Sequence, residues 1–257
     1  MEYEDHAGVV TGAGSGIGRA LSQQLNERGM HVALLDVDEE RLRETRNGLP
    51  DPSRSTMLVA DVSDPAQVSS VAARLVDLRD PLTLLVNCAA VLGPWAKPTL
   101  AVDADQWRRV FDINVLGPLN CVRAFLPLLE GAGESAVIVN VASISGMVAE
   151  GRLGPYAASK HALVSLSETL AIELGDSSLV QVSLACPGGV ATNLNRELRE
   201  SRGPVRTSAD HWLTADDVAS TILEGVDDGP PPYIFTHPAT VPRLQAYFDA
   251  VLAAADI

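Results

Sequence analysis

The stretch TGAGSGIG at residues 11–18 separates two segments of opposite character. The apolar run Ala7–Thr11 predicts a strand, and Ile17–Arg28 has the apolar spacing of three and four that predicts a helix. Glycines let the connecting backbone turn sharply, and N–H groups at a helix N-terminus attract a pyrophosphate. The glycine spacing is G-x-x-x-G-x-G, which could also be a tight turn with close helix–strand packing. The candidate phosphate contacts are Gly12, Ser15, Gly16, Ile17 and Gly18.

The same alternation of apolar runs and amphipathic stretches continues along the chain. Further strands are predicted at His31–Asp36, Thr56–Ala60, Thr83–Asn87, Ala136–Val141, Val180–Ala185 and Tyr233–Thr236. Helices are predicted at Ala66–Leu78, Ala104–Leu116, Tyr156–Leu174 and Ala215–Val226. Strands that consist almost entirely of Val, Leu and Ile are buried on both faces. We therefore predict an α/β fold: a seven-stranded, mostly parallel, doubly wound sheet with helices on both faces.

The composition excludes several classes of protein. The 257 residues carry 33 acidic against 19 basic side chains, a formal net charge of −14, which repels nucleic acid and anionic lipid. The acidic N-terminus and the lack of a long apolar stretch predict a cytoplasmic protein with no membrane partner. The cysteines, Cys88, Cys121 and Cys186, lack metal or disulfide spacing and are predicted to be buried. The five histidines show no metal-ligand pattern and are expected at the surface or as caps.

Asp36 ends the second predicted strand, 18 residues after Gly18. A carboxylate at this position binds both ribose hydroxyls of NAD and repels the 2′-phosphate of NADP. Neither Val37 nor Asp38 is basic, so the sequence predicts NAD rather than NADP.

Tyr156 and Lys160 are four residues apart, which on a helix places both side chains on one face. Such a pair could simply lie on an exposed helix. The functional interpretation is that the ammonium lowers the phenol pKa from about 10 toward working pH. The phenol oxygen could then act as a general acid or base.

These separated motifs, in this order and spacing, resemble the single-domain Rossmann-fold branch of the short-chain dehydrogenase/reductase family over essentially the whole chain, 1–257. The resemblance implies that Ser143 hydrogen-bonds the substrate oxygen and that Tyr156 exchanges a proton with it. It also implies that Lys160 binds the nicotinamide ribose and that Asn114 supports a proton relay through water.

The resemblance implies further contacts. Asp61 and Val62 would contact adenine, and the segment of Pro187, Val190 and Thr192 would bind the nicotinamide amide. Further cofactor contacts are Asn87 and Ala89, in the stretch NCAA at 87–90; the family usually has N-N-A-G there, so Ala90 adds a methyl group beside the cofactor. A substrate flap is predicted at about 188–212. The candidate substrate-pocket residues are Trp95, Ser145, Met147, Glu150 and Trp212.

Pro118 lies four residues after Asn114 within a predicted helical region. Because proline has no N–H, it cannot bond the carbonyl of Asn114. We predict a local distortion of the helix there, with the carbonyl holding a water molecule.

The leading functional hypothesis is an NAD-dependent oxidoreductase that interconverts a secondary alcohol and a ketone on an apolar small molecule, with cyclic molecules among the candidates. The alternative is an NADPH-dependent ketoreductase of the acyl or polyketide type. Acidic residues at Glu130, Glu134 and Glu173, where carrier-dependent reductases carry arginine, argue against an acyl carrier protein as partner. A third alternative is a non-catalytic NAD-sensing protein. The resemblance implies a homotetramer or homodimer, for which the apolar stretch Pro242–Ala255 offers a surface.

Overall fold

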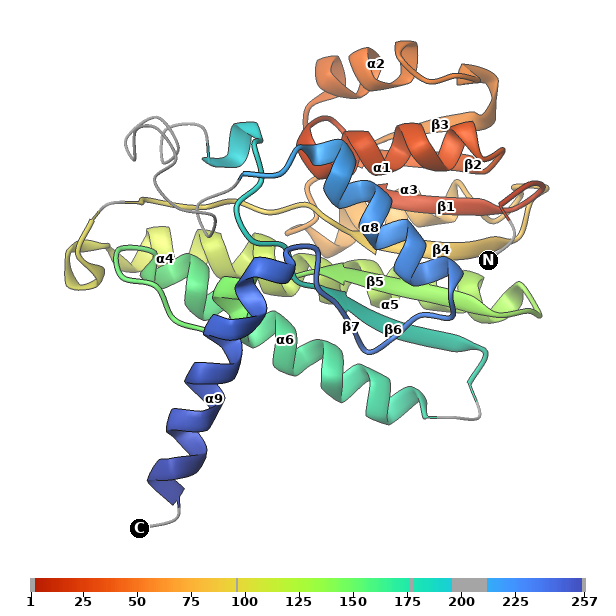
Figure 1. The fold of residues 1–257 in the computed structure, drawn as a ribbon. Helices are drawn as coiled ribbons and strands as arrows, with labels where there is room; N and C mark the ends of the chain where they lie inside the picture. The colour runs from red at the N-terminus through yellow and green to blue at the C-terminus, as the bar shows by residue number, and fades with distance from the viewer. Residues whose placement is uncertain (1–2, 96, 176–177, 196–211, 256–257) are drawn as a thin grey trace.

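The computed structural model describes residues 3–95, 97–175, 178–195 and 212–255 (Figure 1). Its strands are β1 (Ala7–Thr11), β2 (His31–Asp36), β3 (Ser55–Val59), β4 (Leu82–Asn87), β5 (Ala136–Val141), β6 (Val180–Ala185) and β7 (Tyr233–Ile234). They form one sheet in the order β3-β2-β1-β4-β5-β6-β7, and every neighbouring pair is parallel. The predicted α/β fold is confirmed.

Helices cover both faces of this sheet (Figure 1). They are α1 (Gly16–Glu27), α2 (Glu39–Asn47), α3 (Pro65–Ala73), α4 (Ala104–Phe111), α5 (Gly117–Gly131), α6 (Gly154–Leu174), α8 (Ala215–Asp227) and α9 (Val241–Ala255). Short 3-10 turns include η1 (Pro52–Arg54), η2 (Thr99–Ala101), η4 (Ile144–Gly146), η5 (Asn193–Asn195) and η7 (Pro238–Thr240).

Two apolar clusters hold the layers together. On one face, α1 and α8 pack side by side and bury side chains such as Leu21 and Ile222 against β1, β2 and β4. On the other face, α3 and α5 bury side chains such as Val68 and Phe125. Because β1, β2, β4 and β5 contribute side chains to both clusters, both faces of the centre of the sheet are apolar, as the continuous Val, Leu and Ile runs predict.

The observed elements differ from the predicted ones mainly at their ends. Helix α3 begins at Pro65, because the Asp64 carboxylate accepts from the backbone N–H groups of Ala66 and Gln67 and caps the helix. Strand β7 has two residues instead of four, since only Leu184 and Ala185 of β6 pair with it. Both differences are local and leave the topology unchanged.

The helix expected over Ala104–Leu116 does not stay regular to its end. Helix α4 stops at Phe111 and is followed by a π-helical turn, η3 (Asp112–Leu116), in which the Gly117 N–H donates to the Asp112 carbonyl. Pro118, in the first turn of α5, supplies no N–H for the Asn114 carbonyl. The predicted distortion is confirmed, while the bound water stays a prediction.

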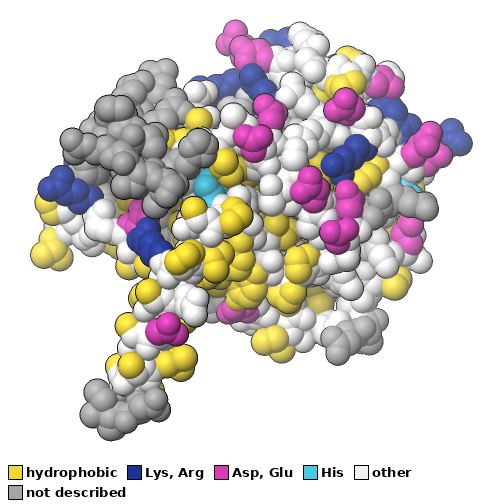
Figure 2. Space-filling view, viewed as in Figure 1, with side chains coloured by type: hydrophobic (Ala, Val, Ile, Leu, Met, Phe, Trp, Pro, Cys, Tyr) yellow, Lys and Arg dark blue, Asp and Glu magenta, His cyan; other side chains and the backbone are white. Residues whose placement is uncertain are grey.

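Helix α9 projects away from the sheet in Figure 1. None of its residues is buried, and Tyr247, Phe248, Val251 and Leu252 are exposed along it. Figure 2 shows apolar side chains on the projecting end of the molecule. Among the described residues, no helix is long and apolar enough to cross a membrane.

Candidate active site

A cleft of about 290 Å³ opens at the carboxyl ends of β1, β2, β3 and β4. The strand order reverses between β1 and β4, and doubly wound sheets bind ligands at such a point. Many of the predicted cofactor contacts line this cleft. They are Gly12, Ser15, Gly16, Ile17, Asp36, Asp61, Val62, Ala89 and Thr192.

The glycine loop has the backbone geometry that the sequence suggested. Gly12 and Gly16 have φ angles of +68° and +53°, a region that favours glycine. Gly18 lies behind the loop, where a Cβ would collide with the Gly12 carbonyl oxygen. Ser15 precedes α1 without capping it through its side chain, so the first N–H groups of α1 have no cap from this hydroxyl.

The hydroxyl of Thr11 connects the end of β1 to the loop after β4. Thr11 Oγ1 accepts from the backbone N–H groups of Cys88 and Ala89, at 2.9 and 3.0 Å. Cys88 lines the cleft and is half-buried. This corrects the expectation that all three cysteines are buried, since only Cys121 and Cys186 are buried. Ala90, which departs from the family motif, also lines the cleft.

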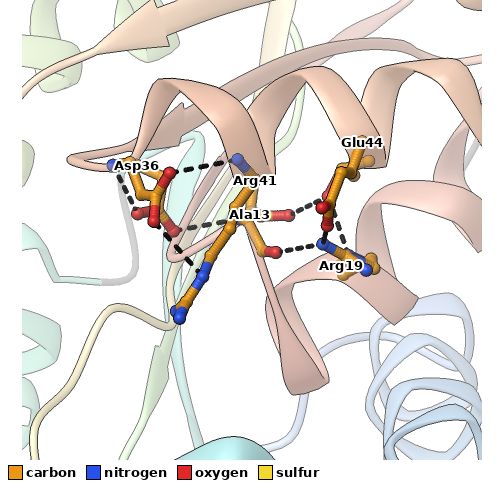
Figure 3. A network of polar contacts seen from close by, with 8 residues as sticks. Ala13, Arg19, Asp36, Arg41 and Glu44 are labelled. Carbon is orange, nitrogen blue, oxygen red and sulfur yellow. Dashed lines mark hydrogen bonds and ion pairs between the residues drawn. The ribbon is translucent and has the colours of Figure 1, made fainter.

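Asp36 is fixed by backbone donors. Its Oδ2 accepts from the Gly14 N–H at 3.0 Å, and its Oδ1 accepts from the Asp38 N–H at 3.0 Å. Figure 3 shows this carboxylate beside Arg41, which forms an ion pair with Asp38 at 3.2 Å and also lines the cleft. Sequence reasoning missed this cation, because it considered only the two residues that follow Asp36.

The same network anchors the glycine loop to α2 (Figure 3). Arg19 donates to the Gly14 carbonyl at 2.6 Å and pairs with Glu44 at 3.0 Å. The Thr45 hydroxyl donates to the Ala13 carbonyl at 2.9 Å. The loop is therefore held in shape by side chains of α1 and α2.

Asp61 lies at the other side of the cleft, after β3. Although burial opposes it, hydrogen bonds from Ser63 and the nearby Arg109 cation hold the pKa of Asp61 below its usual value. Arg109, from α4, pairs with Asp61 at 3.3 Å and lines the cleft. Arg109 is a second cation that sequence reasoning missed, since it lies 48 residues from its partner.

Ser143, Tyr156 and Lys160 come together at the carboxyl end of β5. Ser143 follows β5, and its hydroxyl donates to the Pro187 carbonyl at 3.3 Å. Tyr156 is in the first turn of α6 and is hydrogen-bonded to Ser143. Lys160, one turn later, is 2% exposed, and its Nζ donates to the Val141 carbonyl at 2.7 Å. Its Nζ also lies 5.8 Å from the centre of the Tyr156 ring.

Burial is the main cause of the pKa shifts of Tyr156 and Lys160. It raises the pKa of Tyr156 to about 12, with the Glu150 charge acting in the same direction and the hydrogen bond from Ser143 opposing it. Burial also lowers the pKa of Lys160 to about 8. The sequence hypothesis was that Lys160 lowers the pKa of Tyr156. The structure gives the opposite direction, because the desolvation of the phenol outweighs the other contributions.

Asn114 is fully buried in the π-helical turn. Its Nδ2 donates to the Val91 carbonyl and to Ser159 Oγ, at 2.9 and 3.0 Å, and its Oδ1 accepts from the Val91 N–H at 2.9 Å. Ser159 in turn donates to the Tyr156 carbonyl at 2.7 Å. The side chain thus links the loop after β4 to the helix that carries Tyr156 and Lys160.

A family model described as short chain dehydrogenase matches residues 7–203. The chain belongs to the short-chain dehydrogenase family. The 1-deoxy-11-beta-hydroxypentalenate dehydrogenase of Streptomyces exfoliatus is 34% identical over 252 residues, which cover 98% of this chain and 90% of that protein. The resemblance predicted from the motifs is confirmed, and with it an oxidoreductase that acts on hydroxyl groups.

Solved structures agree with this short-chain dehydrogenase in fold. One from Burkholderia phymatum, in complex with NAD, is 33% identical with a TM-score of 0.85, covering 99% of this chain and 96% of that one. Another from Burkholderia cenocepacia, in complex with NADP, is 26% identical with a TM-score of 0.79, covering 99% and 98%. They support a nicotinamide nucleotide as the cofactor of this dehydrogenase.

Other predicted cofactor contacts of this short-chain dehydrogenase do not line the cleft. Asn87 is buried in β4, where its Nδ2 donates to Asn140 Oδ1 at 2.8 Å. Pro187 and Val190 follow β6, and Val190 forms a bridge with Leu213. Tyr156, Lys160, Gly18, Asn87, Pro187 and Val190 are absent from the described lining of the cleft.

The candidate substrate-pocket residues of the dehydrogenase are spread over three segments. Ser145 is buried in η4, where its N–H donates to Ser143 Oγ at 3.1 Å, and Met147 is half-buried after it. Glu150 is half-buried and pairs with Arg243 of α9 at 2.8 Å. Trp95 and Trp212 are also half-buried, and residues 196–211 of the predicted flap lie outside the described residues.

In the described residues of this short-chain dehydrogenase, no group of His, Cys, Asp and Glu could hold a metal ion. One histidine, His237, is the N-cap residue of η7, although its side chain makes no capping hydrogen bond. His237 is 7% exposed, and its ring is hydrogen-bonded to the backbone after β6.

Proposed function

We propose that this short-chain dehydrogenase uses NAD to interconvert a secondary alcohol and a ketone on an apolar small molecule. The observation that carries the proposal is the arrangement of Ser143, Tyr156 and Lys160 at the end of β5. Three side chains that can hold and move one proton meet at the carboxyl edge of the sheet, beside the cleft lined by the glycine loop.

The residues of the cleft fit a dinucleotide. Gly12 and Gly16 have the positive φ angles of a loop whose backbone can approach a pyrophosphate, and α1 starts without a side-chain cap. Asp36 would bind the adenosine ribose hydroxyls. Lys160 gives one of its three N–H donors to Val141, which leaves donors for the nicotinamide ribose.

Bound NAD would supply the hydride acceptor. Ser143 would turn its hydroxyl from the Pro187 carbonyl to the substrate oxygen, and Tyr156 would take the hydroxyl proton. Asn114 would position α6 through Ser159 and, with a backbone carbonyl to which Pro118 cannot donate, support a water-mediated proton path from Lys160. Because burial raises the pKa of Tyr156 to about 12, oxidation is expected to be fastest at alkaline pH, where the phenol loses its proton.

The substrate is proposed to be apolar. Met147 directly follows η4 and Trp212 packs near Gly189, and both are half-buried, so each could cover part of a hydrocarbon skeleton. The pentalenate dehydrogenase relative is named for a hydroxylated substrate. A hydroxylated, apolar skeleton of that kind is the substrate class to test first.

One observation favours the alternative cofactor. Arg41 lines the cleft next to Asp36, and a guanidinium there could pair with a 2′-phosphate. An NADPH-dependent ketoreductase is therefore the second candidate. Asp36, fixed by two backbone N–H groups, keeps NAD as the first.

A homodimer or homotetramer is also proposed, on the evidence of α9. Its exposed Phe248 and Leu252 are 47% and 64% accessible, and large apolar side chains exposed along one helix are typical of an interface.

The test is an oxidation assay with NAD and a panel of apolar secondary alcohols at alkaline pH. Tyr156→Phe is expected to lower kcat by about 10³-fold or more while NADH titrations stay unchanged. Tyr247→Phe, on the exposed α9, is the matched control and should keep full activity. A Tyr156→Phe enzyme as active as the wild type would refute the proposal.

A further inference from the structure

His237 lies beside the segment that follows β6, although 48 residues separate them in the sequence. The pairing of β7 with β6 brings them together, because Ala185 pairs with Ile234 and the Cys186 N–H donates to the Ile234 carbonyl at 2.8 Å. His237 comes three residues after Ile234, at the start of η7, and is 7% exposed.

Both nitrogens of the His237 ring meet backbone groups of this segment. The Gly188 N–H donates to Nδ1 at 3.0 Å, and Nε2 lies 2.9 Å from the Gly189 carbonyl oxygen. A backbone N–H can only donate and a carbonyl can only accept, so Nδ1 carries no proton and Nε2 carries one. Thr236 Oγ1, 2.8 Å from Nδ1, can donate to the same nitrogen. The neutral ring therefore matches the N–H of one residue and the carbonyl of the next.

Each of the two glycines lies close to an aromatic ring. A Cβ on Gly188 would lie 3.0 Å from the His237 ring, and a Cβ on Gly189 would lie 3.1 Å from the Trp212 indole. The Gly189 carbonyl accepts from the Leu213 N–H at 3.0 Å as well as from His237. The chain at 188–189 is thus held both by the His237 ring and by residues 212–213.

The next residues of the segment reach the cleft. Thr192 lines it, and its methyl carbon would be 3.1 Å from a Cβ on Gly16. Ser143 contacts the start of the same segment through the Pro187 carbonyl. The peptide groups that His237 holds therefore lie between the Ser143 group and the cleft.

We propose that His237 is a positioning residue that holds the backbone of Gly188 and Gly189 so that the following residues bind the nicotinamide end of the cofactor. The proposal rests on the proposed NAD-binding function. In this proposal, His237 makes no direct contact with the cofactor. Its ring supplies one acceptor and one donor to the backbone and thereby sets the position of Val190 and Thr192.

The proposal predicts a selective effect on the two halves of the cofactor. NADH contains the nicotinamide ring, and ADP-ribose lacks it but keeps both riboses and the pyrophosphate. His237→Phe keeps an aromatic ring of similar size and removes both nitrogens. We expect its Kd for NADH to rise about tenfold, equivalent to about 1.4 kcal/mol, while its Kd for ADP-ribose changes less than twofold.

Two further variants complete the experiment, which measures both ligands by calorimetric titration. His237→Gln supplies an amide acceptor and donor and should bind NADH more tightly than His237→Phe. His31→Phe is the matched control, since His31 contacts Thr56 at the amino end of β2, and it should bind both ligands as the wild type does.

The possible results distinguish a failure of the positioning role from a failure of the proposed NAD-binding function. Equal weakening of NADH and ADP-ribose in His237→Phe, or wild-type affinity for NADH, would overturn the positioning role while leaving the proposed function intact. A His237→Gln variant no better than His237→Phe would also count against it. A wild-type protein that binds neither ligand would instead overturn the proposed NAD-binding function itself.

Discussion

Replacing Asp36 with asparagine tests how the cleft selects its cofactor. The substitution removes one negative charge but keeps the side-chain size and one oxygen acceptor for the Gly14 or Asp38 N–H. The expected result is a large loss of preference for NADH over NADPH, because the carboxylate attracts ribose hydroxyls and repels a 2′-phosphate.

The magnitude follows from the position of the carboxylate. Two like charges about 4 Å apart repel by about 4 kcal/mol at an effective dielectric constant of about 20. Asp36 is half-buried, so solvent and salt reduce this to about 1–2 kcal/mol, or about 5–30-fold in NADPH affinity. Weaker hydrogen bonds to the ribose would cost NADH about tenfold. The affinity ratio of NADH to NADPH should therefore fall about 50–300-fold.

The assay is a fluorescence titration of each variant with NADH and with NADPH at fixed ionic strength. Asp64→Asn is the matched control, since asparagine also caps a helix and Asp64 is not among the described residues that line the cleft. Adding Arg41→Ala to Asp36→Asn should remove the gain in NADPH binding. An unchanged NADH to NADPH ratio in Asp36→Asn would refute the reasoning, because Asp36 would then have no role at the ribose.

Three further predictions concern the loop, the proton and the assembly. Gly18→Ala should weaken NADH binding and destabilise the fold by about 1–3 kcal/mol in thermal unfolding, because its Cβ meets the Gly12 carbonyl; Gly131→Ala, with open space around it, should do neither. Glu150→Gln should move the pH profile of oxidation to lower pH. Burial and then the Glu150 charge raise the pKa of Tyr156, and oxidation needs the deprotonated phenol, so removing the charge should lower that pKa. A pH profile that stays in place or moves to higher pH would contradict this. Leu252→Glu should reduce the mass measured by light scattering, and an unaltered mass would argue against α9 as the interface.

The sequence was sufficient for the fold because its signals are local. Continuous Val, Leu and Ile runs predict strands buried on both faces, and the glycine loop at 11–18 indicates where the first strand passes into a helix. Asp36 was found because it directly ends a strand. Pro118 predicted the helix distortion, because the N–H that proline lacks would have bonded the carbonyl four residues earlier.

The parts that sequence reasoning missed depend on distant segments. Arg109 meets Asp61 across 48 residues, and His237 meets Gly188 only because β7 pairs with β6. No pattern within a short stretch of sequence indicates which distant residues will meet. The direction of the Tyr156 pKa was also wrong, because a spacing of four residues places two side chains on one face and says nothing of how deeply the phenol is buried.

The π-helical turn at Asp112–Leu116 acts as one extra residue in a helix that otherwise runs from α4 into α5. Each residue of an α-helix turns about 100° around the axis, so the extra residue rotates α5 by that amount relative to α4. Helix α4 therefore faces α6, whereas α5 faces α3 and β4. Deleting one residue from this turn would rotate α5 back by about 100° and direct its apolar stripe away from the sheet. A single-residue deletion here should thus be far more harmful than one in the loop at residues 132–135.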